Sequence, residues 1–167
     1  SSNSPLLRAL VQNWLCKEKS DGKKPVIVKE LMSTVITLLP PTANLSDVLA
    51  QMQAQGTSCV LITENSVVLG IITERDLLRV FSDQISAPNA DAGLLSVQAL
   101  MTTEPISVLE NTPLLDALVL SRSRKLRHLP VINGDGKLVG LVTHTNMADA
   151  YVKLLDRQGE LESANEQ

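Results

Sequence analysis

The sequence predicts a mixed α/β (α+β) fold made of two copies of one β-α-β-β-α unit, related by a pseudo-twofold axis. The heptapeptides GIITERD and GLVTHTN repeat at a constant offset of 70 residues, with Gly70 opposite Gly140 and Thr73 opposite Thr143. The segments around them repeat in the same order. Neither copy is long enough to bury a stable core alone, so the two should pack against each other.

Each copy reads as a short extended segment, a helix, a β-hairpin and a second helix. Apolar residues at i, i+3, i+4 and i+7 from Leu45 predict the first helix. Two apolar runs around a turn predict the hairpin, and the turn NGDG at 133–136 is a strong hairpin signal. Besides that first helix, the predicted elements cover 35–38, 59–62, 67–72 and 74–81 in the first copy and 106–109, 129–132, 137–142 and 144–155 in the second.

Composition and charge restrict the classes of function that the sequence allows. The chain has 167 residues, 44% of them hydrophobic but only three aromatic, so the core should be aliphatic. A net charge of −3 offers no basic field for nucleic acid or an anionic membrane. Cys59 lies in an apolar run and reads as a buried thiol. The sequence has no signal-like segment or long apolar run, so a cytoplasmic protein is expected.

The sequence predicts no enzyme. It shows no nucleophile–base pairing, metal-ligand spacing or glycine-rich phosphate loop. His128 and His144 are the only histidines, and His144 reads as an exposed first-turn residue. We therefore expect no catalytic residue, no metal and no cofactor.

The segment Thr73–Asp76 supports two interpretations. A Thr at the end of a strand, followed three residues later by a carboxylate, is typical of a helix capping box. The same geometry puts a carboxylate near a helix N-terminus, where it can accept hydrogen bonds from two vicinal hydroxyls of a ligand. Capping and ligand binding do not exclude each other. In the second copy Asn146 replaces the carboxylate.

The motif G-h-h-T-x-x-D at the end of the second hairpin strand, repeated in register with the same element order, resembles the CBS domain. The resemblance covers about residues 26–152, and two such repeats form a Bateman module. The chain is then expected to divide into a lead-in with an amphipathic helix over 1–25, repeats over 26–83 and 96–152, a linker over 84–95 and a helical extension over 153–167.

The resemblance also implies a regulatory ligand, an adenine nucleotide such as AMP, ADP or ATP. In CBS pairs each cleft draws on both repeats, with the TxxD carboxylate on the ribose. One cleft then places adenine along 103–106 and the sugar-phosphate near Thr112, with Arg127 and His128 toward the phosphates. The residues implied for this stronger cleft are Thr73, Asp76, Thr103, Pro105, Ile106, Thr112, Arg127 and His128.

The opposite cleft should bind more weakly. It has Asn146 in place of a carboxylate and no basic residue, and losing a charge-assisted hydrogen bond costs about 1–2 kcal/mol, or roughly five- to thirtyfold in affinity. The residues implied for this weaker cleft are Val35, Ile36, Thr42, Thr57, Ser58, Thr143 and Asn146.

Several cations precede the second hairpin. Arg122 and Arg124 fit a solvated helix end. Arg127 and His128 adjoin the strand, and in the kinase gamma subunits that sense AMP a His-Arg pair at this position contacts phosphate. Here the order is reversed, which leaves open which side chain points inward. His128 also fits a buried histidine with a hydrogen-bond partner.

One apolar helical face, over 6–15, lies before the repeats, and another, over 147–161, continues past the end of the second repeat. Each must pack on the module or across an interface between subunits, and we expect a homodimer. The polar end of the chain fits either a helix leading into a signalling output domain or a frayed terminus. Two other functions remain open: a structural dimerisation module with empty clefts, and a sensor of another adenosyl ligand such as S-adenosylmethionine or a cyclic dinucleotide.

Overall fold

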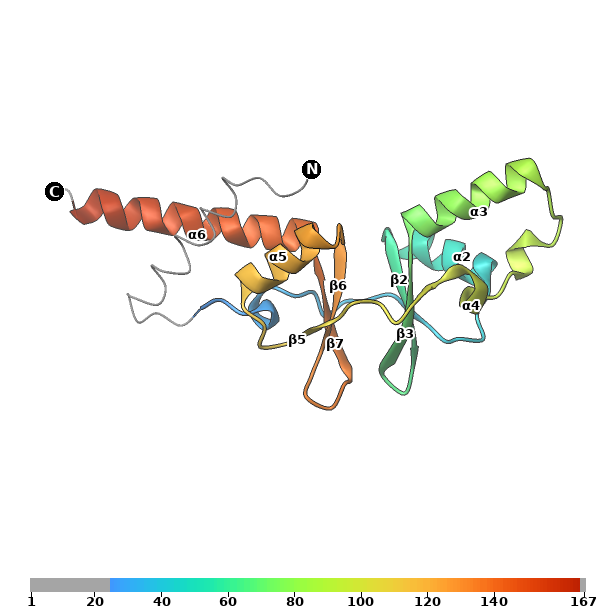
Figure 1. Ribbon diagram of the computed structural model, residues 1–167, viewed down its shortest axis with the longest axis horizontal. Helices are drawn as coiled ribbons and strands as arrows, with labels where there is room; N and C mark the ends of the chain where they lie inside the picture. The colour runs from blue at the N-terminus through green and yellow to red at the C-terminus, as the bar shows by residue number, and fades with distance from the viewer. Residues whose placement is uncertain (1–24, 166–167) are drawn as a thin grey trace. The chain divides into compact units, whose positions relative to one another are not determined.

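The computed structural model describes residues 25–165, with side chains described as far as Asp156 (Figure 1). The predicted helix over 6–15 lies outside the described residues. Two sheets and five α-helices occur in the described range, which confirms the predicted mixed α/β fold class. The elements are η1 Val28–Glu30, β1 Leu38–Leu39, α2 Leu45–Gln55, β2 Cys59–Glu64, β3 Val67–Thr73, α3 Glu74–Ser86, η2 Ala92–Leu94, α4 Val97–Leu100, β4 Thr102–Thr103, β5 Val108–Leu109, α5 Leu114–Ser123, β6 His128–Ile132, β7 Leu138–Thr143 and α6 His144–Asn165.

Contacts divide the described chain into two compact units. One holds residues 33–107 and 132–140 and is called the Asp76 unit here. The other holds residues 25–32, 108–131 and 141–165 and is called the Asn146 unit. These units differ from the predicted repeats in two ways: the leading segment of each copy belongs with the other copy, and residues 132–140 of the second copy belong to the Asp76 unit. The repeat boundaries themselves stay a prediction.

The first sheet has the strand order β1-β2-β3-β4. Strand β1 is parallel to β2, whereas β3 is antiparallel to both β2 and β4. Strand β4 comes from the start of the second copy and pairs Thr103 with Gly70. A Cβ at position 70 would overlap the side chain of Met101, so glycine is what lets this segment approach β3.

The leading segment of the first copy makes the corresponding contacts with the second copy. The backbone N–H of Val28 donates to the carbonyl of Thr112 at 2.9 Å, and that of Leu114 donates to the carbonyl of Val26 at 2.8 Å. Val28 is fully buried. Each copy therefore needs the start of the other to complete its packing.

The core of the Asp76 unit is aliphatic, as composition predicts. Helices α2 and α3 and the short helix α4 contribute apolar side chains that pack on the sheet. Burying each large aliphatic side chain contributes about 1.5–3 kcal/mol. The cluster contains Ala43, Leu45, Val48, Met52, Val60, Ile62, Ile72, Leu77, Val80 and Val97.

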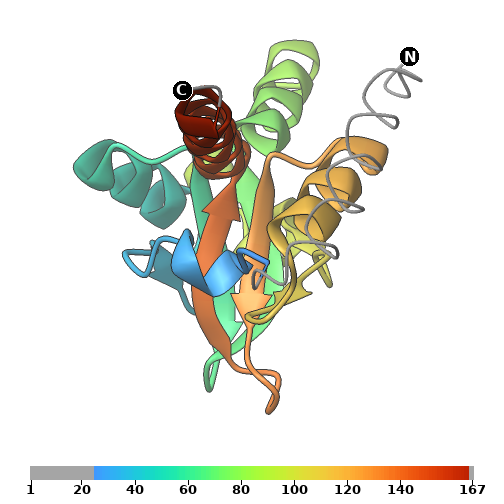
Figure 2. The same cartoon turned by 90° about the vertical axis from the view of Figure 1, so that its left-hand side faces the viewer.

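The second sheet has the order β5-β6-β7. Strands β6 and β7 form the predicted hairpin, and β7 leads directly into α6 (Figure 2). The side chain of Asn133 accepts hydrogen bonds from the backbone N–H groups of Asp135 and Lys137, and Gly136 has φ +76°, which only glycine adopts readily. The predicted NGDG turn is confirmed.

Three of the described α-helices carry large exposed apolar side chains, and on α5 this side chain is Val119. On α3, Leu78, Phe81 and Ile85 are exposed in a row that the sequence analysis did not single out. Helix α6 covers the predicted closing helix over 144–155 and continues to Asn165, and Val152 and Leu155 on it are exposed. Met147, assigned above to the same apolar face, is fully buried and so is not available for an interface.

Candidate functional site

Thr73 and Asp76 meet where β3 ends and α3 begins. Thr73 is the N-cap residue of α3. Its backbone N–H donates to Oδ2 of Asp76 at 2.9 Å, and its hydroxyl donates to the same oxygen at 3.2 Å. The carboxylate thereby satisfies a backbone donor that the helix itself leaves without a partner. The predicted capping contact of Asp76 is confirmed.

The other carboxylate oxygen has two further donors. The guanidinium of Arg79 donates to Oδ1 at 2.7 Å, and the hydroxyl of Thr102 donates to it at 3.3 Å. Asp76 is only 5% exposed, whereas the Arg79 side chain is 67% exposed. The carboxylate is therefore a buried anion that four donors of the chain itself surround.

Sequence reasoning missed both Arg79 and Thr102. Arg79 had a usable signal, because a cation three residues after a carboxylate lies on the same helical face. Thr102 had none, because its contact depends on the pairing of β4 with β3.

Asn146 begins α6 in the same way in the second copy. Its side-chain oxygen accepts from the backbone N–H of Thr143 at 3.1 Å and from the hydroxyl of Thr143 at 2.8 Å. The Asn146 N–H donates back to that hydroxyl at 3.1 Å. An amide oxygen thus caps this helix as a carboxylate caps α3.

Cys59 lies at the start of β2, beside the Thr73–Asp76 junction, and pairs with Thr73 across the hairpin. It is 3% exposed, which confirms the predicted buried thiol. Burial, together with a smaller effect of the negative charge of Asp76, raises the pKa of the thiol from 9.0 to about 12. The thiol is therefore neutral and unreactive at physiological pH.

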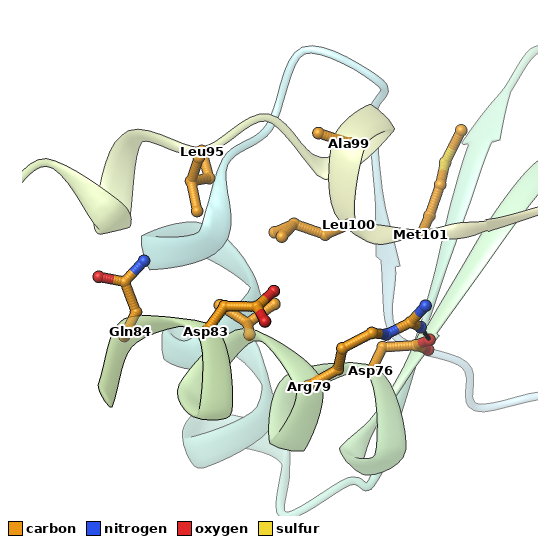
Figure 3. Close-up of a pocket in the computed structure, with 9 residues that line it drawn as sticks. Asp76, Arg79, Asp83, Gln84, Leu95, Ala99, Leu100 and Met101 are labelled. Carbon is orange, nitrogen blue, oxygen red and sulfur yellow. Dashed lines mark hydrogen bonds and ion pairs between the residues drawn. The ribbon is translucent and has the colours of Figure 1, made fainter. Parts of the chain in front are cut away.

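A groove of about 270 Å³ opens between α3 and α4 in the Asp76 unit (Figure 3). Arg79 reaches along it toward Asp76, and the carboxylate of Asp83 points into it. The opposite wall is apolar. The lining residues are Asp76, Arg79, Val80, Asp83, Gln84, Leu95, Ala99, Leu100 and Met101.

The residues implied for the stronger cleft divide between the two units. The Asp76 unit holds Thr73, Asp76, Thr103, Pro105 and Ile106, and β4 pairs Thr103 with Gly70 of β3. Thr103 is exposed and Ile106 is 38% exposed, so both offer surface to a ligand.

Thr112, Arg127 and His128 belong to the Asn146 unit. Arg127 is exposed, and its carbonyl accepts the N–H of His144 at 2.8 Å. His128 begins β6 and is half-buried. A shared cleft of these three residues with Asp76 stays a prediction.

The residues implied for the weaker cleft divide in the same manner. Thr143 and Asn146 lie in the Asn146 unit, and the others lie in the Asp76 unit. Thr57 donates its hydroxyl to the Cys59 carbonyl at 3.1 Å. The assembly of the residues implied for the weaker cleft into one site also stays a prediction. The members in the Asp76 unit are Val35, which is 86% exposed, Ile36, Thr42, Thr57 and Ser58.

Other sequence predictions can be placed directly. Arg122 and Arg124 are exposed at the end of α5, and His144 is exposed in the first turn of α6, all as predicted. Within residues 25–165 no group of three or more His, Cys, Asp or Glu side chains could hold a metal ion. None of the helices described is both long and apolar enough to span a membrane.

Known proteins share this organisation. The family model for the CBS domain matches residues 28–83 and 97–153. An uncharacterized 17.7 kDa protein of Acidianus ambivalens is 31% identical over 127 residues, covering 75% of this chain and 73% of that protein. A CBS domain-containing protein of Dictyostelium discoideum is 29% identical, covering 78% and 94%.

Solved structures agree with these matches. The structure of CBSX2 in complex with AMP has a TM-score of 0.66 at 26% identity and covers 77% of this chain and 97% of that one. CBSX2 is a protein of Arabidopsis thaliana. A CBS domain protein of Pyrobaculum aerophilum complexed with AMP has a TM-score of 0.65 at 22% identity, covers 72% of this chain and 89% of its own, and shares the fold. The chain belongs to the CBS domain family, with two tandem CBS repeats.

Proposed function

We propose that this CBS pair is a regulatory sensor of an adenine nucleotide (AMP, ADP or ATP), with a stronger site at Asp76. The observation that carries the proposal is the buried Asp76 carboxylate at the β3–α3 junction, beside the strand β4. A carboxylate can accept hydrogen bonds from both hydroxyls of a ribose. The complex of the related CBSX2 with AMP supports this choice of ligand.

In this proposal Asp76 holds the ribose and Thr73 lies near the phosphate. Thr103, Pro105 and Ile106 contact the adenine. Thr112 would approach the sugar-phosphate, and Arg127 and His128 would approach the phosphates. The second cleft, with Asn146 and Thr143, binds more weakly because an amide oxygen is a weaker acceptor than a carboxylate.

The protein would act by binding alone, as a cytoplasmic subunit or part of a signalling protein, without chemistry of its own. We propose a homodimer, and the exposed row of Leu78, Phe81 and Ile85 on α3 supports an interface between subunits. Helix α6 would lead toward an output domain. Light scattering at tens of micromolar should give twice the monomer mass, and a monomer would exclude the dimer.

A second candidate function is a structural module in which Asp76 serves as a helix cap only. It is favoured by the four donors of the chain that already surround the carboxylate. Capping needs one acceptor oxygen, which Asn146 also provides in the second copy. The two candidates therefore differ in what Asp76→Asn does to ligand binding.

A thermal-shift screen tests the proposed function. AMP, ADP, ATP, S-adenosylmethionine and a cyclic dinucleotide would each be titrated against the parent and Asp76→Asn. A ligand at one hundred times its Kd stabilises the native state by about 2.7 kcal/mol. We expect a shift with an adenine nucleotide that Asp76→Asn reduces. If none of the five compounds shifts the melting temperature, the structural module is the function that remains. A response only to S-adenosylmethionine or only to the cyclic dinucleotide would make that compound the ligand.

A further inference from the structure

The acceptor positions of Asp76 are already occupied by the chain. Oδ2 accepts from the backbone N–H and the hydroxyl of Thr73, and Oδ1 accepts from Arg79 and Thr102. An ionised carboxylate offers about four lone-pair sites. A ribose that binds this carboxylate must therefore replace at least one of these donors.

Arg79 is the donor that can leave most easily. The N–H of Thr73 is fixed by the backbone at the start of α3, and Thr102 is held by the pairing of β4 with β3. The Arg79 side chain is long and 67% exposed, so water can solvate its guanidinium once it leaves Asp76.

A second acceptor for Arg79 lies on the same helix. Asp83 follows Arg79 by four residues, is exposed, and lines the same groove. Figure 3 shows its carboxylate directed into the groove, further along the face of α3 that carries Arg79. Oppositely charged side chains at this spacing pair on a helix surface. Released from Asp76, the guanidinium thus has a counter-charge within the groove.

We propose that Arg79 is an internal competitor for Asp76, which pairs with this carboxylate until a ribose diol replaces it and then pairs with Asp83. The inference rests on the proposed function, because it assumes that Asp76 binds ribose. It makes Arg79 a determinant of nucleoside affinity without any contact to the ligand.

The test compares Arg79→Ala with Arg75→Ala, an exposed arginine on the same helix, as a matched control. Calorimetry would use adenosine, because it has no phosphate whose attraction to a cation would mask the competition. Arg79→Ala should tighten adenosine binding about threefold to tenfold, and Arg75→Ala should change it by less than about twofold. The gain should shrink for 2′-deoxyadenosine, which lacks the diol. Urea unfolding would confirm that both variants fold.

Asp83→Asn tests the second acceptor. It should weaken adenosine binding about twofold to threefold in the parent, because Arg79 then has only Asp76 to pair with. In the Arg79→Ala background the same substitution should have no effect, which makes the two changes strongly non-additive.

The possible results distinguish a failure of the competitor role of Arg79 from a failure of the proposed nucleotide binding. Equal adenosine affinity in Arg79→Ala and Arg75→Ala overturns the competitor role, and AMP binding by the parent would then keep the proposed function. An Asp83→Asn effect that persists without Arg79 overturns the transfer to Asp83. Absence of AMP and adenosine binding in the parent and in every variant overturns the proposed function, and this inference with it.

Discussion

The two strand-to-helix junctions share one capping geometry but differ in one atom. In both, a side-chain oxygen accepts from the backbone N–H and the hydroxyl of the threonine three residues earlier. The second oxygen of Asp76 then accepts from Arg79 and Thr102. At the same place Asn146 has an amide nitrogen, which is a donor and cannot do this.

The difference separates helix capping from any further role. Asn146 demonstrates that one neutral oxygen is enough to begin a helix here. The charge and second oxygen of Asp76 are therefore surplus to capping, and the first copy keeps them buried. Binding of a ribose would use both.

Asp76→Ala should have the largest effect. It removes the cap and the ribose acceptor together, so it should lower the free energy of unfolding by about 1–3 kcal/mol and weaken AMP binding more than about thirtyfold. Urea unfolding and calorimetry measure the two losses.

Asp76→Asn is the matched control for that loss. An amide oxygen can still cap α3, as it does for α6, so the unfolding free energy should fall by only about 1 kcal/mol. AMP affinity should still fall about five- to thirtyfold. Unchanged affinity in both variants would leave Asp76 with capping alone.

Asn146→Asp reverses the comparison in the second copy. A carboxylate there should strengthen the weaker site by about five- to thirtyfold, because its hydrogen bonds to ribose become charge-assisted. Calorimetry should then fit two sites in place of one. A variant that folds but gains no second site would mean that the second cleft lacks more than the carboxylate.

Arg127→Ala tests whether this residue contacts the phosphate of a nucleotide bound at the stronger site. Loss of one charge-assisted contact should weaken AMP binding about threefold to tenfold and leave adenosine binding unchanged. Arg124→Ala, which also removes an exposed cation, is the control. Equal weakening of AMP and adenosine by Arg127→Ala would contradict a phosphate contact.

Cys59 should affect stability alone, and only in the first copy, because Leu129 occupies the matching position in the second. Between pH 9 and 12 the native thiol stays protonated while the unfolded thiol ionises. The native state then binds more protons, so its stability falls as pH rises. The chain's other cysteine, Cys16, would be replaced by serine so that only Cys59 titrates as a thiol. In this Cys16→Ser background the free energy of unfolding should drop by about 1–1.5 kcal/mol from pH 8 to pH 10.

Cys59→Ala in the same background removes this contribution and serves as the control. Lysine and tyrosine titrate alike in both proteins, so only the difference between the two pH profiles counts. Parallel profiles would mean that Cys59 ionises as readily in the native state as in the unfolded chain.

The element order could be predicted from the sequence because apolar spacing is local. The helix from Leu45, both hairpins and the Thr73 cap lie where the pattern indicates. The pairing of β4 with β3 could not be predicted, since Thr102 and Thr103 form a strand of two residues with no alternation to read. Their partner is selected across the chain, where Gly70 admits the side chain of Met101.

In the candidate site, too, local contacts could be predicted from the sequence and tertiary contacts could not. Thr73 and Asp76 are close in sequence, and their contact could be predicted as a capping box. Arg79 was within reach of the same helical reasoning, but a charged residue on an exposed face is usually solvated. The Thr102 contact depends on tertiary pairing, so no local pattern contains it.

Calorimetric titration of the parent protein with AMP tests the central claim most directly, because the account requires the two junctions to be unequal. It predicts one AMP per chain at the stronger site, with most of that affinity lost in Asp76→Ala and retained in Asn146→Ala. Two equal sites per chain, or a single site that Asp76→Ala leaves intact, would contradict it.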